Sequence, residues 1–231
     1  MGRQLVKLLQ VGKIKYGSGL HLQQHFVQLH KTTTENQNTL IIVEHPHVYT
    51  TGIRDSKYSQ SEEEKLKQKG AEFYRTNRGG LITYHGPGQL VAYPILNLHN
   101  FSPRIHWYID KIEKTILNLC NKFKLEAELL GDRGVWIKDK KICSVGLHGS
   151  RYITSHGFAL NCNPDLSWFD HIVPCGIEGK GVTSLSQELG REVTIAETLP
   201  VLLESFKEVF EVDLIDYPEE EAGYIHKTFV K

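Results

Sequence analysis

Paired cysteines are missing from this sequence of 231 residues. It contains Cys120, Cys143, Cys162 and Cys175, and no two of them form a CxxC pair. A chain of this length can bury enough apolar surface to fold without disulfide bonds. The cysteine pattern therefore predicts a protein of a reducing compartment.

Long apolar runs and an excess of charge are also absent. No apolar run approaches the ~18 residues of a membrane-spanning helix, so we predict no membrane partner. Lysine plus arginine equals aspartate plus glutamate at 27 each, and bulk nucleic-acid binding therefore has no electrostatic support. The hydrophobic content of 40% and the charged content of 23% are typical of a globular chain with a substantial core.

Several motifs for metal, nucleotide and serine chemistry are missing as well. The sequence has no GxxxxGK(S/T) phosphate loop, no GxSxG serine elbow and no HExxH zinc motif. Zinc is an alternative because the chain has 12 histidines and four cysteines, but the candidate ligands lack the paired spacing of structural zinc sites. These candidates are Cys143, His148, His156, Cys162, His171 and Cys175. We predict no metal site and no cofactor.

Apolar periodicity predicts strands and helices that interleave without a regular βαβ rhythm. Strands are expected at 4–11, 39–44, 71–76, 134–138, 141–147, 152–161 and 211–215, and two short β segments flank the HGPG run at 85–88. Helices are expected at 16–31, at 62–69 after a Ser61 cap, from Ser102 to Phe123, and after a capping box at Thr194. This order favours a single α/β (α+β) domain over residues 1–231, with 217–231 as a flexible tail.

Cys175 lies between Pro174 and Gly176, in a stretch that also holds His156 and Gly157. Proline fixes one backbone torsion and glycine frees the next, which predicts a thiol on a sharp turn. Such a turn can project a nucleophile into a cleft. The alternative is a small buried hydrophobic residue, because free cysteines are among the most buried residues.

Lys141 starts one of the predicted strands, and Cys143 follows it at the same-face spacing of two. A neighbouring ammonium group enriches the reactive thiolate of a cysteine, whose ordinary pKa is ~8.5. A lysine in a cleft can also act as a general acid or base. The alternative is a solvated lysine, and sequence alone cannot place Lys141 beside Cys175 because 34 residues separate them.

Four segments, in this order and spacing, resemble the lipoyl(octanoyl) transferases. They are RGGLITYHGPGQLVAYPI at 78–95, GVWIKDKKICSVG at 134–146, TSHGFALN at 154–161 and VPCGIEGKGVTSL at 173–185. The sequence around TSHGFALN is most similar to those of animal mitochondrial members, which implies a mitochondrial address rather than a bacterial cytoplasm. Residues 1–34 carry no acid, as in a mitochondrial presequence, although Leu5–Leu9 also fits a first strand.

The resemblance implies the catalytic-domain fold of biotin and lipoate protein ligases. It implies transfer of an octanoyl group from acyl carrier protein to a lysine of lipoyl domains, those of 2-oxoacid dehydrogenase E2 subunits and of glycine cleavage H protein. Cys175 is implied as the nucleophile that carries the acyl thioester, and Lys141 as the residue that lowers its pKa and serves as general acid and base. The substrate-binding residues implied are Arg78, Gly79, Gly80, Leu81, Ile82, Thr83, Tyr84, His85, Ser144, Val145, Gly146, His156, Gly157, Phe158 and Ala159.

Three other functions fit parts of this pattern. An ATP-dependent lipoate or biotin ligase shares the fold, but the loop RGGLITYHGPGQL differs from the SGGGAVYHDxGN of lipoate ligases. A cysteine hydrolase would release free fatty acid, and a non-catalytic binding module for acyl carrier protein would form no acyl-enzyme. For a carrier protein, which is generally acidic, the basic segment 133–151 is the predicted docking surface.

Overall fold

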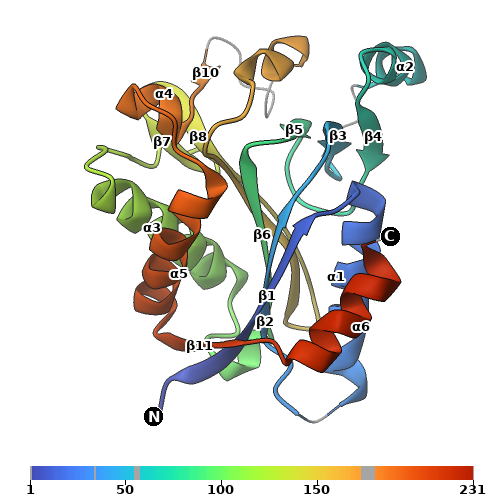
Figure 1. Ribbon diagram of the computed structural model, residues 1–231, viewed down its shortest axis with the longest axis vertical. Coiled ribbons are helices and arrows are strands. Elements are labelled where there is room, and N and C mark those ends of the chain that lie inside the picture. Colours follow the sequence, from blue (N-terminus) through green and yellow to red (C-terminus); the bar gives the residue numbers. More distant parts are fainter. Residues whose placement is uncertain (1, 34, 55–57, 173–179, 231) are drawn as a thin grey trace.

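The computed structural model describes residues 2–33, 35–54, 58–172 and 180–230 (Figure 1). The described strands are β1 (Gln4–Lys13), β2 (Thr39–Glu44), β3 (Val48–Thr51), β4 (Glu72–Arg75), β5 (Thr83–His85), β6 (Gln89–Ile95), β7 (Val135–Ile137), β8 (Lys140–Ser150), β9 (Ile153–Asn161), β10 (Gly181–Val182) and β11 (Val212–Asp216). The described helices are α1 (Tyr16–Thr32), α2 (Gln60–Gln68), α3 (Ile105–Lys122), α4 (Leu185–Leu189), α5 (Ile195–Phe210) and α6 (Glu219–Phe229), with short 3-10 helices η1 (Leu98–Asn100) and η2 (Leu166–His171). The predicted strand at 4–11 is therefore present as β1.

These strands form two sheets within the described part of the chain. The larger sheet has eight strands in the order β10-β8-β9-β6-β2-β1-β11, with β7 paired to β8, and the smaller has the order β4-β3-β5. β2 pairs in parallel with β1 and antiparallel with β6, so the larger sheet is mixed. The continuous apolar run of β2 is buried on both faces, as predicted.

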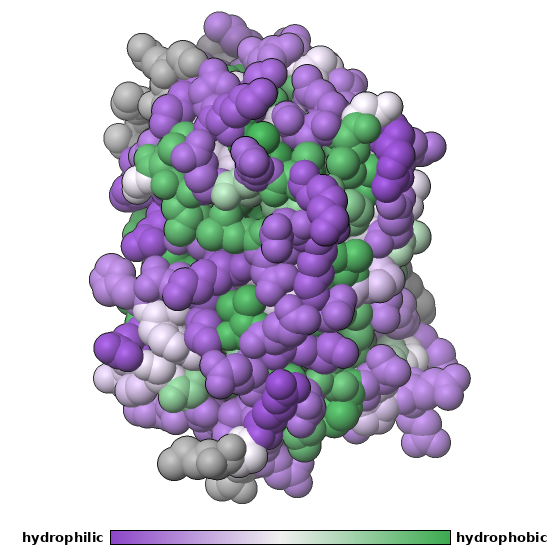
Figure 2. All heavy atoms as spheres, turned by 90° about the vertical axis from the view of Figure 1, so that its left-hand side faces the viewer, coloured by the Kyte–Doolittle hydropathy of each residue, from purple (hydrophilic) through white to green (hydrophobic). Residues whose placement is uncertain are grey.

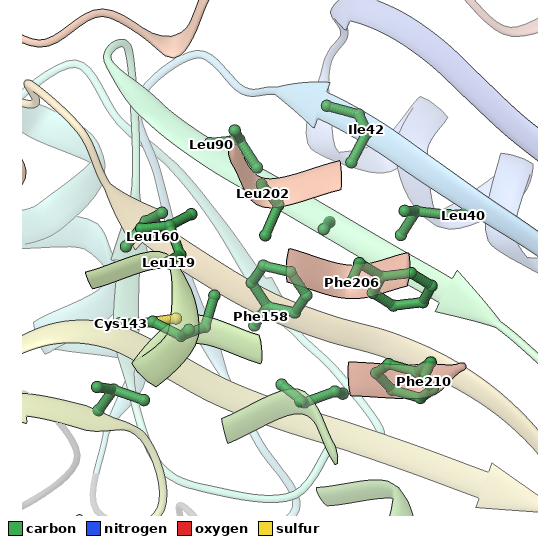
Figure 3. Close-up of a cluster of buried hydrophobic side chains, with 14 of the residues drawn as sticks. Leu40, Ile42, Leu90, Leu119, Cys143, Phe158, Leu160, Leu202, Phe206 and Phe210 are labelled. Carbon is green, nitrogen blue, oxygen red and sulfur yellow. The ribbon is translucent and has the colours of Figure 1, made fainter. Parts of the chain in front are cut away.

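Helices cover the larger sheet on both faces (Figure 1). α3 and α5 pack on one face, where Leu202, Phe206 and Phe210 of α5 meet side chains of β2, β6 and β9 (Figure 3). α1 and α6 lie on the other face, over a second cluster of buried side chains. The side of the molecule that carries α3 and α5 is mainly hydrophilic, with smaller hydrophobic patches, as amphipathic helices require (Figure 2).

Two local predictions of helix starts differ from the structure. The cap of α2 is Ser59, not Ser61: Ser59 Oγ accepts a hydrogen bond from the backbone N of Glu62, and the Glu62 carboxylate accepts one from Ser59 N at 2.7 Å. Both serines have a glutamate three residues later, so the sequence alone does not choose between them. Helix α3 begins at Ile105, because the Ser102 carbonyl accepts from Arg104 N in a tight turn before it.

The C-terminal residues differ from the predicted flexible tail. Residues Glu219–Phe229 form α6, and its Ile225 is only 2% exposed among the side chains under α1. Ala222, Ile225 and Phe229 recur at three- and four-residue spacing, a helical pattern that the preceding acidic run obscures. None of the described helices is long and apolar enough to cross a membrane.

Candidate active site

A cavity of about 270 Å³ opens where β8, β9, the loop before β5 and the start of α3 meet. Most residues of the three implied substrate-binding segments line it, and so does Lys141. These residues are Arg78, Gly79, Gly80, Leu81, Thr83, His85, Ser144, Val145, Gly146, His156, Gly157, Phe158 and Ala159. The fold thus brings segments that are far apart in sequence around one space, while their role in substrate binding stays a prediction.

Ile82 and Tyr84 are the two implied substrate-binding residues that do not line the cavity. Both are fully buried in a separate apolar cluster with Tyr49 and Phe169. Side chains alternate between the two faces of an extended segment, so the neighbours of Ile82 and Tyr84 face the cavity and these two face away.

Other lining residues were not among the substrate-binding residues that the resemblance implied. They are Tyr16, Arg54, Val91, Tyr93, Ile105, Ile109, Asp132, Arg133, Leu147 and Gly149. Several are apolar residues at ordinary strand or helix spacing, which predicts burial but does not distinguish a core from a cavity wall. The packing of α1, α3 and β6 against β8 and β9 brings Tyr16, Val91, Tyr93, Ile105 and Ile109 to the site, while the segments after β3 and before β7 supply Arg54, Asp132 and Arg133.

Arg78 organises the glycine-rich wall of the cavity. Its guanidinium group is buried and donates to the Thr50 carbonyl at 2.7 Å, to the Leu81 carbonyl at 2.9 Å and to the Gly79 carbonyl at 3.0 Å. The loop is therefore wrapped around its own arginine. A Cβ on Gly146 would lie 3.0 Å from Arg78 Cδ and 3.2 Å from the Gly79 carbonyl, so β8 approaches this loop too closely for a side chain at that position.

His85 is held as a neutral imidazole on the same wall. Gln89 Nε2 donates to Asn161 Oδ1 at 2.9 Å, which leaves Gln89 Oε1 to accept from His85 Nδ1 at 2.7 Å. His85 Nε2 can then only accept, and the Thr50 hydroxyl lies 3.4 Å from it. Burial, with the nearby His45 and Arg78, lowers the pKa of His85 to about 3.

His156 of β9 lines the cavity beside the loop that carries Arg78, and its backbone is unusual. Its φ of +57° lies in the left-handed region, which non-glycine residues rarely adopt and which is enriched at functional sites. Its backbone N donates to Gln23 Oε1 at 2.7 Å and its Nε2 lies 2.8 Å from Asn77 Oδ1. Burial, reinforced by the positive charge of Arg78, lowers the pKa of His156 to about 3.

Lys141 places a buried ammonium group in the cavity wall. Its Nζ donates to the Arg133 carbonyl at 3.1 Å and lies 4.6 Å from the centroid of the Trp136 ring, and the residue is 4% exposed. Among the described residues Lys141 takes part in no ion pair. Its two described partners, the Arg133 carbonyl and the Trp136 ring, are therefore both neutral.

Lys141 and Cys143 do not share a face, contrary to the prediction from their spacing. Val135 pairs with Cys143 and Trp136 with Lys141, so Ile142 is an extra residue in β8 and forms a β-bulge. The bulge interrupts the alternation of side chains: Lys141 lines the cavity, whereas Cys143 packs in the core under α3 and α5 (Figure 3).

Three cysteines are unsuited to nucleophilic attack. Cys120, Cys143 and Cys162 are fully buried, and burial raises the pKa of the Cys120 and Cys162 thiols to about 12 and that of Cys143 well above its ordinary value. Cys175 lies outside the described residues. Nor do the described residues contain a group of histidine, cysteine or carboxylate side chains that could hold a metal ion.

The fold and the sequence segments both have counterparts among known proteins. The family described as the lipoyl protein ligase A/B catalytic domain matches residues 15–207. The structure of lipoate-protein ligase A bound with ATP has a TM-score of 0.72 to this chain at 18% sequence identity, covering 100% of this chain and 95% of that one. The predicted fold class, that of the ligase catalytic domains, is confirmed.

Two curated relatives are much more similar in sequence. The mitochondrial octanoyl-acyl-carrier-protein:protein N-octanoyltransferase of Danio rerio is 55% identical over 90% of this chain and 94% of its own length. The enzyme of the same name from Xenopus tropicalis is 47% identical over 90% of this chain and 88% of its own. Both names confirm the mitochondrial address predicted from the sequence. The chain therefore belongs to the lipoyl protein ligase A/B catalytic domain family, and within that family it is an octanoyltransferase.

Proposed function

We propose that this octanoyltransferase moves the octanoyl group from acyl carrier protein to a lysine of lipoyl domains through a thioester on Cys175. The observation that carries the proposal is the buried ammonium group of Lys141, without a carboxylate partner among the described residues, in the wall of a largely apolar cavity. Val91, Val145 and Phe158 provide apolar surface for a straight acyl chain. The positive charge of Lys141, which no described carboxylate neutralises, would favour the thiolate form of a Cys175 side chain next to it.

The reaction proceeds in two steps of similar difficulty. The Cys175 thiolate attacks the carbonyl carbon of the donor thioester, the carbon–sulfur bond to the phosphopantetheine arm breaks, and Lys141 gives its proton to the departing sulfur. The amine of the acceptor lysine then attacks the enzyme thioester, Lys141 takes a proton from that amine, and Cys175 leaves as a thiolate. A thioester is consumed and an amide is formed, so the transfer is downhill without a nucleotide.

The test is the intact mass of the enzyme after mixing with octanoyl-acyl carrier protein and no acceptor. We expect the mass of one octanoyl group to be added, and Cys175→Ala to abolish both this addition and the transfer. Cys143→Ala and Cys162→Ala serve as matched controls and should keep both, because their thiols are buried and their pKa is raised. A peptide map that places the thioester on Cys143 would overturn the assignment.

Lys141→Ala tests the proposed role of Lys141 as general acid and base and as the group that lowers the pKa of Cys175. Loss of the proton donor should slow both half-reactions by roughly 10²–10⁴-fold, the usual weight of general acid–base catalysis. The pKa of the Cys175 thiol should rise, and this is measured as the pH dependence of its alkylation by iodoacetamide. An alkylation profile identical to that of the wild type would exclude a role for Lys141 in forming the thiolate.

The acceptors proposed are the lipoyl domains of 2-oxoacid dehydrogenase E2 subunits and glycine cleavage H protein. Isolated lipoyl domains should discharge the acyl-enzyme and gain the octanoyl group, and a domain whose acceptor lysine is replaced by arginine should not. Release of free octanoate at the same rate with and without a lipoyl domain would instead indicate a cysteine hydrolase.

A further inference from the structure

One aromatic ring next to the cavity contacts two cations. The indole of Trp136 on β7 has Lys141 Nζ at 4.6 Å and Lys180 Nζ at 4.8 Å from its centroid. Trp136 is 1% exposed, so its ring is shielded from water. A cation within about 6 Å of an aromatic face is attracted by the ring, and the attraction strengthens as water is excluded.

Strand pairing explains why two lysines from distant parts of the chain meet on this ring. β10 runs parallel to β8 with Gly181 opposite Lys140 and Val182 opposite Lys141, and Thr183 N donates to the Lys141 carbonyl at 3.0 Å. Lys180 immediately precedes β10. β7 lies antiparallel to β8, with Trp136 opposite Lys141. Three chain segments therefore converge on the ring.

The Arg133 carbonyl, which is the second neutral partner of Lys141, is also held in place. Glu113 of α3 is buried, and its carboxylate accepts from Gly134 N at 3.0 Å and from Arg133 Nη1 at 3.4 Å. These bonds fix the Arg133 backbone, whose carbonyl accepts from Lys141. The Glu113 carboxylate is thus bound to Arg133 and Gly134, while among the described residues the Lys141 ammonium group is bound by a carbonyl and a ring.

We propose that Trp136 is a positioning residue of the transferase reaction, which holds the Lys141 ammonium group at the cavity wall without neutralising it, and that Lys180 adds a second positive charge at the same point. The inference rests on the proposed function of Lys141. A carboxylate would hold an ammonium group equally well but would cancel the charge that favours a thiolate. An aromatic face restrains the ammonium group and leaves the charge in place.

Other charged groups line the cavity or contact the partners of Lys141, and they set the background for any pH measurement. They are Glu113 of α3, Asp132 and Arg133 before β7, Lys180 beside β10, and Arg54 and Arg78 elsewhere on the cavity wall. Only Lys180 can be removed without disturbing the lining of the cavity or a hydrogen bond of Lys141, so Lys180→Met is the informative charge change.

The experiment compares Trp136→Leu, Trp136→Phe and Lys180→Met with two control variants. The controls are Trp107→Leu and Lys111→Met, which disrupt another cation–π pair of the chain, at 5.7 Å on α3 and away from the cavity lining. Trp136→Leu should lower kcat by roughly 5- to 30-fold with little change in KM, while Trp136→Phe, which keeps an aromatic face, should restore most of the rate. Lys180→Met should raise the pH midpoint of Cys175 alkylation by about half a unit.

The outcomes separate this inference from the proposed function. If Lys141→Ala is slow but Trp136→Leu and Trp136→Phe have the same kcat, the positioning role is wrong and the role of Lys141 stands. If Trp107→Leu lowers kcat as much as Trp136→Leu, the effect is general packing and the inference fails. If Lys141→Ala keeps the full rate, the proposed function itself fails. If Trp136→Leu does not fold, the Lys180→Met shift decides the matter, and an unchanged midpoint refutes the proposal.

Discussion

Acidification from about pH 7.5 to about pH 5 is expected to destabilise this protein far more than its surface charge suggests. The reason is a group of buried imidazoles near the cavity, of which His45 is the clearest. His45 Nδ1 lies 2.7 Å from the Ile14 carbonyl and must donate to it, so Nε2 accepts from the Tyr93 hydroxyl at 2.7 Å. Protonation of Nε2 would break that bond and place a charge in the core. Burial accordingly lowers the pKa of His45 to about 4.

The size of the effect follows from linkage. Between the folded and unfolded pKa values the unfolded chain binds more protons, so the stability from these neutral histidines is complete above about pH 6.5 and is lost as pH falls toward their folded pKa. At about pH 5 each loses ~2 kcal/mol, which is about 1.5 pH units at ~1.4 kcal/mol per unit. His85 and His156, whose pKa burial lowers to about 3, shift in the same direction. A combined loss of about 4–6 kcal/mol is comparable with the whole stability of a typical domain.

The assay is urea unfolding at the two pH values, in a window where carboxyl groups, with ordinary pKa near 4, still contribute little. His45→Gln keeps an acceptor for Tyr93 and cannot titrate, so its pH-dependent loss should be smaller by about 2 kcal/mol. His106→Gln, at an exposed position on α3, should behave like the wild type. A free energy of unfolding equal at both pH values, or a His45→Gln variant with the same pH dependence as the wild type, would refute the reasoning.

Three further predictions concern docking, strand packing and energy coupling. Of the basic residues in segment 133–151, Arg133, Lys138, Lys140 and Arg151 are exposed and only Lys141 is buried, so added salt and Lys138→Glu should both weaken donor binding in steady-state kinetics. Lys124→Glu is the control, because Lys124 is exposed and has a similar positive φ but lies outside the segment. Kinetics that do not depend on salt would contradict this docking surface. Gly157→Ala should lower the free energy of unfolding by about 1–3 kcal/mol or more, because the new Cβ would overlap the Ala92 carbonyl and lie 2.8 Å from Pro94 Cδ, whereas Gly149→Ala, with its nearest neighbour Ile105 Cδ1 at 3.4 Å, should change it little. Transfer should proceed without ATP and in the presence of a metal chelator, and strict ATP dependence would instead favour a ligase.

The sequence by itself determined most of the elements and the segments around the site. Apolar periodicity is a local property, so it located β1, β2 and α1 within a residue or two of their observed limits. The four motif segments indicated the family, and three of them, at 78–95, 134–146 and 154–161, supply much of the described cavity lining. Glycine at positions such as Gly146 is required there because two backbones approach closely. Alternation along the strand could also have shown that Ile82 and Tyr84 face away.

Tertiary structure decided what depends on contacts between distant residues. The extra Ile142 separates Lys141 from Cys143, and a bulge has no local signal because it exists only relative to the partner strand. The choice of Ser59 over Ser61 and the burial of Ile225 depend in the same way on how each helix meets the rest of the molecule. The meeting of Lys141 and Lys180 on Trp136 requires β7, β8 and β10 to be adjacent, and no spacing in the sequence encodes that adjacency.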